Sequence, residues 1–215
     1  MMGVVIGEPG TGKSTAAAAY AANEKGVVLC RVTKAASDIQ PLLVRLCEAL
    51  GENVTPNQSK ADLYETALWS LTQPFKAKNL MLLDEAQHLS DDAMECARDL
   101  FDESQVGVVL IGNKGLKRWE VSQKSKKSNS FAQLRGRIGQ FMDIKMPLDE
   151  DLTALCEYYN LQGGCLTLVR KVARKEGQLH LVAKLIQVAG DLLDEGQSIT
   201  PSILKDAGEI VGVTL

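Results

Sequence analysis

The stretch Gly7-Glu8-Pro9-Gly10-Thr11-Gly12-Lys13-Ser14 is the most informative part of this sequence. It follows the apolar run 4–6 and leads through Thr15 into an alanine-rich segment, an order that predicts a strand, a glycine-rich loop and a helix. The glycines allow the backbone to curl so that successive N–H groups point inward, and the helix that begins near Lys13 adds the positive end of its dipole. The pattern is typical of a site for the phosphate groups of a nucleotide.

Within this motif, each polar group has an expected role. Lys13 is expected to reach the β- and γ-phosphates of bound ATP, and the Ser14 hydroxyl to complete the oxygen shell of a Mg²⁺ ion. The residues expected to contact the nucleotide are Gly7, Glu8, Pro9, Gly10, Thr11, Gly12, Lys13, Ser14 and Thr15. The alternative is a glycine-rich turn that binds no ligand, which the flanking strand and helix disfavour.

Polar side chains also follow two later strand-like runs. The run 79–83 ends in Asp84 and Glu85, and open α/β sheets bind ligands at the carboxyl ends of their strands. We expect Asp84 to hold Mg²⁺ through water, and Glu85 to polarise the water that attacks the γ-phosphate. A pair that only caps the following helix is the alternative. After the run 107–111, Asn113 is expected to contact the γ-phosphate or the attacking water, with ordinary turn chemistry as its alternative.

Apolar runs and helical patterns alternate along the first two thirds of the chain. Strand-like runs occur at 4–6, 27–32, 79–83, 107–111 and, more weakly, 141–146. Helical patterns occur at 13–23, 38–50, 59–72 and 90–103. This alternation predicts an α/β fold, a five-stranded parallel sheet between helices.

From Pro147 onward, the strand-like runs disappear and helical periodicity takes over. The helical patterns lie at 149–160, 164–175, 178–194 and 201–211, the last beginning with Thr200 as N-cap and a proline at the first helical position. We therefore expect a nucleotide-binding subdomain over residues 1–147 and a small all-helical lid over 148–215.

The composition fits one α/β domain with a small appendage. With 45% hydrophobic residues among 215, the chain can bury a full core. It has no apolar run near the roughly 20 residues that span a bilayer, and it opens on a strand, so a cytoplasmic location is expected. The five cysteines are scattered without a C-x-x-C pair, which favours reduced, partly buried thiols.

The net charge of −3 provides no bulk attraction to nucleic acid, so any DNA contact must come from local patches or from many subunits together. The candidate DNA contacts fall in two basic patches: Lys114, Lys117, Arg118, Lys124, Lys126 and Lys127 in the first, and Arg170, Lys171, Arg174 and Lys175 in the second. A solvated charged face is an equally good interpretation of each patch.

The glycine loop, the pair Asp84 and Glu85, Asn113, an arginine pair at Arg135 and Arg137, and the four-helix lid follow one another in the chain. This order of parts resembles that of the AAA+ ATPases. More narrowly, the segments 83–89, 111–113 and 131–139 and the ending near 199–200 are similar to transposition ATPases of the phage Mu B type. The resemblance implies ATP-dependent assembly of a homo-oligomeric filament on duplex DNA with little sequence preference. It further implies delivery of that DNA to a transposase and disassembly after hydrolysis.

The same resemblance assigns roles to residues outside the phosphate motif. Arg137 matches the arginine that reaches the γ-phosphate of a neighbouring subunit, with Arg135 as second candidate and surface ion pairing as the alternative for both. His180 stands where many relatives carry a γ-phosphate-binding arginine, a role it can take only when protonated or as a neutral donor. Only Met1 to Gly3 precede the first strand-like run, whereas the family usually has an N-terminal segment that helps to hold adenine. The resemblance therefore leaves adenine binding open and allows the expectation of a shortened protein.

Two functions of other classes stay open. One is a replication initiator or helicase loader, which should bind a replicative helicase and form no filaments on naked duplex DNA. The other is a nucleotide-gated interaction module with little hydrolysis, which should keep partner binding after Glu85→Gln.

Overall fold

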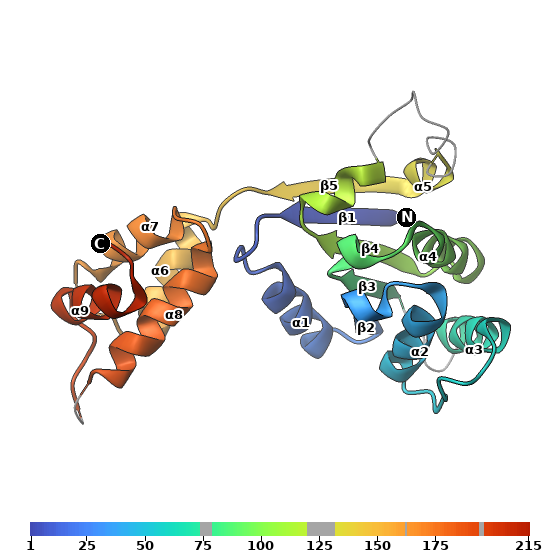
Figure 1. Cartoon of the computed structure of the whole chain (residues 1–215), viewed down its shortest axis with the longest axis horizontal. Helices are drawn as coiled ribbons and strands as arrows, with labels where there is room; N and C mark the ends of the chain where they lie inside the picture. Colours follow the sequence, from blue (N-terminus) through green and yellow to red (C-terminus); the bar gives the residue numbers. More distant parts are fainter. Residues whose placement is uncertain (74–78, 120–131, 162, 194–195) are drawn as a thin grey trace. The chain divides into compact units, whose positions relative to one another are not determined.

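The computed structural model of this chain describes residues 1–73, 79–119, 132–161, 163–193 and 196–215 (Figure 1). The chain divides into two compact units. The first comprises Met1–Ile6 and Lys13–Asp143, and the second comprises Gly7–Gly12 and Ile144–Leu215. The glycine loop therefore groups with the C-terminal helices, although it follows the first strand in sequence.

The first unit is built on a five-stranded sheet with the order β2-β3-β4-β1-β5. The strands are β1 (Met2–Gly7), β2 (Val27–Arg31), β3 (Leu80–Asp84), β4 (Gly107–Gly112) and β5 (Ile138–Ile144). β2 is parallel to β3, β3 to β4 and β4 to β1, and the arrowheads of β1 and β5 point the same way in Figure 1. The predicted parallel sheet is confirmed.

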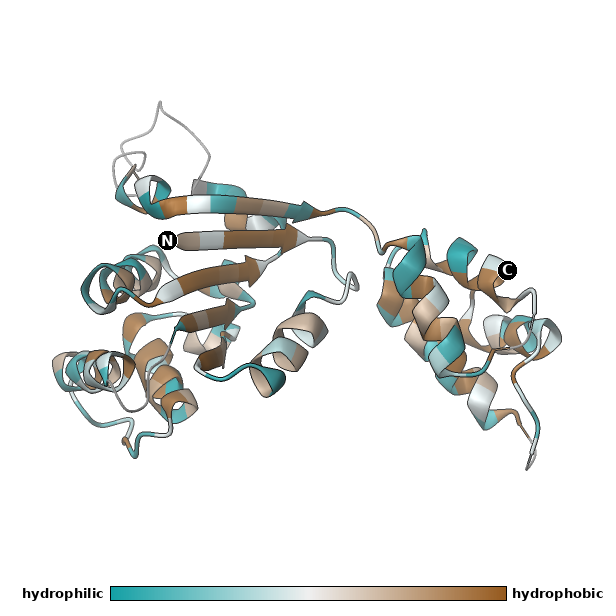
Figure 2. Ribbon diagram, turned by 180° about the vertical axis from the view of Figure 1, so that it is seen from behind, coloured by the Kyte–Doolittle hydropathy of each residue, from teal (hydrophilic) through white to brown (hydrophobic). Residues whose placement is uncertain are grey.

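Helices cover the two faces of the sheet unequally. The longer helices of this unit are α1 (Lys13–Asn23), α2 (Ile39–Leu50), α3 (Lys60–Thr72) and α4 (Asp91–Ser104). Since side chains alternate along a strand, Val28 and Leu110 are buried in a core with α2, α3 and α4, whereas Leu82 and Ile111 pack on Ala17 of α1. Strands β1 to β4 are accordingly mostly brown, the hydrophobic colour, in Figure 2.

Among the residues that the structure describes in this unit, four short helices were not predicted. They are α5 (Ala132–Arg137) and the 3-10 helices η1 (Lys34–Ala36), η3 (Ala86–His88) and η4 (Lys114–Trp119). None exceeds six residues, a length too short to establish a helical period in sequence. α5 bears on function because it carries both candidate arginines.

The four predicted C-terminal helices are confirmed as α6 (Asp149–Tyr158), α7 (Cys165–Ala173), α8 (Gln178–Asp191) and α9 (Pro201–Val211). They enclose a separate core around Val169, Leu185 and Leu204. The Thr200 hydroxyl accepts the Ile203 N–H at 3.4 Å, as expected of the predicted N-cap. No helix in the described ranges is long and apolar enough to cross a membrane.

All five cysteines are free and buried, as the sequence predicted. Burial raises the pKa of the Cys30, Cys47 and Cys96 thiols to about 11. These side chains are therefore neutral packing groups at physiological pH rather than nucleophiles.

Candidate functional site

The glycine loop joins β1 to α1, as the sequence predicted. Gly10 and Gly12 have φ values of +87° and +86°, in the left-handed region that residues with side chains rarely adopt. Within the loop, the Thr11 hydroxyl donates to the Glu8 carbonyl at 3.0 Å. The resulting tight curve of successive N–H groups suits a phosphate oxyanion.

The parallel register brings the polar residues at the strand ends to one edge of the sheet. Ile6 of β1 lies opposite Gly112 of β4, and Asp84 ends β3, the other neighbour of β4. Asp84 is only 4% exposed, and Glu85 and Asn113 follow directly after their strands. Asp84, Glu85 and Asn113 thus share the carboxyl edge of three adjacent strands, where ligands bind in such sheets.

The Glu85 carboxylate is held by Gln87, a residue that sequence reasoning missed. Glu85 has φ +58°, and the Gln87 side-chain amide donates to Glu85 Oε2 at 2.5 Å. The same amide accepts the Asn113 N–H at 3.2 Å through its oxygen, so Gln87 links the ends of β3 and β4. A left-handed non-glycine residue costs of the order of 1 kcal/mol, and such strain is concentrated at functional sites. Here it accompanies a fixed carboxylate.

The side-chain oxygen of Asn113 accepts the Gly115 N–H at 2.7 Å. This bond is the turn chemistry that the sequence left open for Asn113. This bond uses the side-chain oxygen of Asn113 as an acceptor. The side-chain NH₂ group is the donor with which Asn113 could contact a phosphate. Its catalytic role stays a prediction.

The oxygen donors at the start of α1 and at the end of β3 fit Mg²⁺. Ser14 is the second residue of α1 and supplies a hydroxyl, and buried Asp84 supplies a carboxylate. Mg²⁺ prefers a few protein oxygens together with phosphate and water oxygens. Among the described residues, no three His, Cys, Asp or Glu side chains group as a metal site. One hydroxyl and one carboxylate therefore suit a metal bound together with a nucleotide.

Arg137 lies at the end of α5 and pairs with Asp102 of α4. Its Nε donates to Asp102 Oδ1 at 3.1 Å and its Nη2 to Oδ2 at 3.0 Å, while Arg98 Nη1 lies 2.6 Å from Oδ2. The surface ion pair that the sequence allowed as an alternative is therefore formed within a single chain. Arg137 keeps 38% of its side chain exposed, and Arg135, two residues before the helix end, is partly exposed.

The Arg137–Asp102 pair predicts a pH-dependent contribution to stability. The hydrogen bond from Arg137 lowers the pKa of Asp102 below its ordinary value of 3.8. A lowered pKa stabilises the fold above the unfolded value and ceases to do so as pH falls through the folded value. Because both groups are partly exposed, we expect Asp102→Asn to lower the free energy of unfolding by about 1 kcal/mol at pH 7. The difference should shrink below pH ~4, as urea unfolding at both pH values would show.

His180, which the family resemblance makes a candidate for binding the γ-phosphate, lies in the second unit. It is exposed in the first turn of α8, close in sequence to Leu179, whose N–H donates to Gly10 of the glycine loop at 2.9 Å. The structure thus brings the start of α8 to the loop, whereas the contact of His180 with a phosphate stays a prediction.

In each basic patch, some side chains are bound to other groups of the chain and others are exposed. Lys117 pairs with Asp143 at 3.5 Å and lies over the Phe141 ring, and Arg118 donates to the Gln87 and Leu89 carbonyls. Lys114 is exposed, and Lys124, Lys126 and Lys127 lie outside the described residues. In the second patch, Arg170 pairs with Asp149 and Lys175 donates to the Thr214 carbonyl, whereas Lys171 and Arg174 are exposed around the end of α7.

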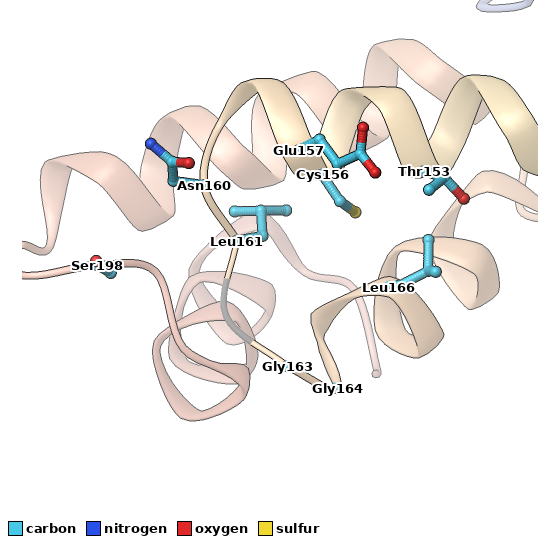
Figure 3. Close-up of a pocket in the computed structure, with 9 residues that line it drawn as sticks. All are labelled: Thr153, Cys156, Glu157, Asn160, Leu161, Gly163, Gly164, Leu166 and Ser198. Atoms are coloured by element: carbon cyan, nitrogen blue, oxygen red, sulfur yellow. The ribbon is translucent and has the colours of Figure 1, made fainter.

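A pocket of about 550 Å³ lies in the second unit, between the end of α6 and the start of α7 (Figure 3). Its lining includes Thr153, Glu157, Asn160 and Ser198, with the Cys156 sulfur directed toward it. None of the predicted site residues lines this pocket. The candidate site is therefore defined by its strand ends and glycine loop rather than by this cavity.

Comparison with known proteins supplies a family and several relatives. The family model described as "AAA domain" matches residues 1–119. The chain is 26% identical over 206 residues to the ATP-dependent target DNA activator B of Escherichia phage Mu, covering 95% of this chain and 64% of that protein. It is 23% identical over 186 residues to the Mu-like prophage FluMu DNA transposition protein B of Haemophilus influenzae, covering 85% and 63%. The chain thus spans less than two thirds of the length of these relatives.

Two solved structures show a similar fold at low sequence identity. The ORC2 protein of Aeropyrum pernix in its ADP form has a TM-score of 0.70 and 14% identity, covering 97% of this chain and 62% of that one. The RuvB Holliday junction branch migration motor of Thermotoga maritima has a TM-score of 0.57 and 15% identity, covering 97% and 61%. At these identities, the likeness concerns the fold alone.

Proposed function

This chain belongs to the AAA domain family, and we propose that it is an ATP-hydrolysing, DNA-binding protein that assembles on duplex DNA and delivers it to a transposase. The observation that carries the ATPase proposal is the meeting of Asp84, Glu85 and Asn113 at the sheet edge where β1 leads into the glycine loop. We retain residues 1–147 as the nucleotide-binding subdomain and 148–215 as the lid.

In the proposed reaction, the chain's own residues bind the triphosphate and direct a water molecule. The loop N–H groups and Lys13 hold the phosphates, because fixed donors and a cation match their negative charge. Glu85, held by Gln87, accepts a hydrogen bond from the attacking water and aligns it with the γ-phosphorus. Asn113 donates an amide N–H to the γ-phosphate or to that water. Mg²⁺, held by Ser14 and through water by Asp84, would neutralise charge that develops on the phosphate oxygens.

The proposal for DNA and transposase rests on the relatives. Their names describe an ATP-dependent target DNA activator and a DNA transposition protein, and both come from phage or prophage genomes. We therefore propose the bacterial cytoplasm as the place of action. An acidic chain with small basic patches favours binding through many subunits, each adding a few phosphate contacts.

Electron microscopy of the protein with duplex DNA, with and without ATP, tests this function. We expect filaments on unrelated duplexes only when ATP is present. Binding to a replicative helicase without filaments on naked DNA would instead identify a loader. Stable ATP-dependent partner binding with negligible turnover would identify an interaction module.

Among the described residues, we choose Lys171 and Arg174 as the candidate DNA contacts to test, because both are exposed and they lie close together around the end of α7. We expect the double variant Lys171→Ala, Arg174→Ala to weaken binding similarly for unrelated duplexes. If both contact phosphates, the slope of log affinity against log salt should fall by about 2. The matched control is Lys184→Ala, Lys205→Ala, which removes the same charge from exposed positions on α8 and α9. Equal slopes for the two double variants would exclude α7 as the contact.

A further inference from the structure

We propose that Leu179, in the first turn of α8, is a positioning residue that holds the glycine loop in its phosphate-binding shape. Leu179 and the loop residues Gly7–Gly12 belong to the same compact unit, so the contact lies within one body. The expected effect of Leu179 on ATP affinity rests on the proposed function, whereas its expected effect on the shape of the loop does not.

The backbone of Leu179 makes the first contact. Its N–H donates to the Gly10 carbonyl at 2.9 Å. N–H groups in the first turn of a helix have no partner within the helix, and the N-cap of α8 is Gly177, which has no side chain to accept one. The Gly10 carbonyl therefore serves as the cap of α8, while His180 N–H bonds back to Gly177.

Capping by Gly10 also fixes a donor of the loop. In a trans peptide the carbonyl and the following N–H point in opposite directions. When the Gly10 carbonyl is directed at α8, the Thr11 N–H is directed to the other side of the peptide plane. The bond from that N–H to the Glu8 carbonyl is long, at 3.4 Å. Leu179 thus sets the direction of a donor that the phosphate motif uses.

The side chain of Leu179 makes the second contact, against Gly12. A Cβ atom at Gly12 would lie 3.3 Å from Leu179 Cδ1, and one at Gly10 would lie 2.0 Å from the Gly177 carbonyl oxygen. The loop backbone and the α8 turn therefore approach so closely that Gly10 must be glycine for space as well as for its positive φ. Leu179 therefore contacts the loop through both its backbone N–H and its side chain.

The turn that presents Leu179 is itself held in place. Gly177 and Gln178 have φ values of +91° and +41°, and the Gln178 amide, only 9% exposed, donates to the Lys145 carbonyl at 3.1 Å. At the start of the loop, a Cβ at Gly7 would lie 2.7 Å from the Ile144 carbonyl oxygen. The last residue of β5 thus supports the loop at Gly7, and the residue that follows it supports the α8 turn through Gln178.

Such support favours binding because a glycine-rich loop otherwise loses much backbone freedom when it closes on a ligand. A loop already held in its bound shape has less entropy to lose, so the ligand binds more tightly. The predicted effect of removing Leu179 is therefore a looser loop before nucleotide arrives and a weaker complex afterwards.

Leu179→Ala tests this role, with Leu181→Ala as the matched control. Both leucines are partly buried, lie in the first turns of α8 and pack on the same lid core. Of the two, Leu179 is the one whose side chain faces a loop glycine, with its Cδ1 3.3 Å from the position of a Cβ at Gly12. In nucleotide-free protein, we expect the loop amides of Leu179→Ala to exchange hydrogen about tenfold faster. A fluorescent ATP analogue should bind about threefold to tenfold more weakly. Leu181→Ala should change neither, even where its thermal unfolding temperature falls equally.

A second variant isolates the backbone bond. Replacement of Leu179 by leucic acid, which has the same side chain but an ester oxygen in place of the N–H, should also speed exchange of the loop amides. Unchanged loop exchange in both variants would overturn the proposal, as would equal acceleration in Leu181→Ala. Faster loop exchange in a protein that binds no ATP analogue would support the role of Leu179 and contradict the proposed ATPase function.

Discussion

Glu85→Gln should lower ATP turnover by about a hundredfold or more while ATP stays bound. The substitution removes the carboxylate that polarises water but keeps a side-chain oxygen that can accept the bond from Gln87, so the local geometry should survive. Turnover is measured by phosphate release, and binding by a fluorescent ATP analogue. Because the nucleotide is retained, ATP-dependent filaments should form and persist.

His88→Asn is the control for this variant. His88 Nε2 lies 3.9 Å from Glu85 Oε2, close enough to disturb the same surroundings without being placed to activate water. Its turnover should stay near that of the wild type. Equal turnover in the wild type and Glu85→Gln would remove Glu85 from the reaction, and negligible turnover in the wild type would favour the nucleotide-gated module.

Arg137→Ala should bind ATP nearly normally as a monomer but lose turnover and ATP-dependent assembly on DNA. A guanidinium that reaches a neighbouring subunit can stabilise the charge spread over the γ-phosphate oxygens, an effect of about a thousandfold or more where such arginines act. The structure adds a condition, since Arg137 is bound to Asp102 within the single chain. To act in trans, it must exchange this partner for phosphate when subunits assemble.

Mixing variants tests the action in trans. Arg137→Ala subunits supply an intact phosphate loop and Lys13→Ala subunits supply the arginine, so the mixture should recover part of the turnover that each lacks. Asp102→Asn is the structural control, because it weakens the same ion pair but keeps the guanidinium. Its assembled turnover should stay near wild type. If Arg137→Ala hydrolyses ATP at the wild-type rate on saturating DNA, Arg137 is not the arginine that acts in trans. Arg135 should then be tested in the same way.

Much of the fold follows from local sequence patterns. The loop at 7–14, the runs that became β1 to β4 and the helices at 13–23 and 201–211 are confirmed because apolar period, glycine and capping residues act within a few neighbouring positions. The AAA+ resemblance is confirmed in the same way, since its motifs lie at those strand ends. By contrast, α5 was missed because six residues are too few to show a period.

The tertiary structure alone decided the partners of the functional side chains. Arg137 is hydrogen-bonded to Asp102 across 35 positions of sequence, and Gln87 to Asn113 across 26. Leu179 is hydrogen-bonded to Gly10, which lies much farther away in the sequence. The residues of a long strand or helix carry its periodic pattern and capping residues themselves, so such an element can be predicted from its own stretch of sequence. A contact between distant residues depends on strand order, register and the direction of each connection, and these are set by how the whole core packs.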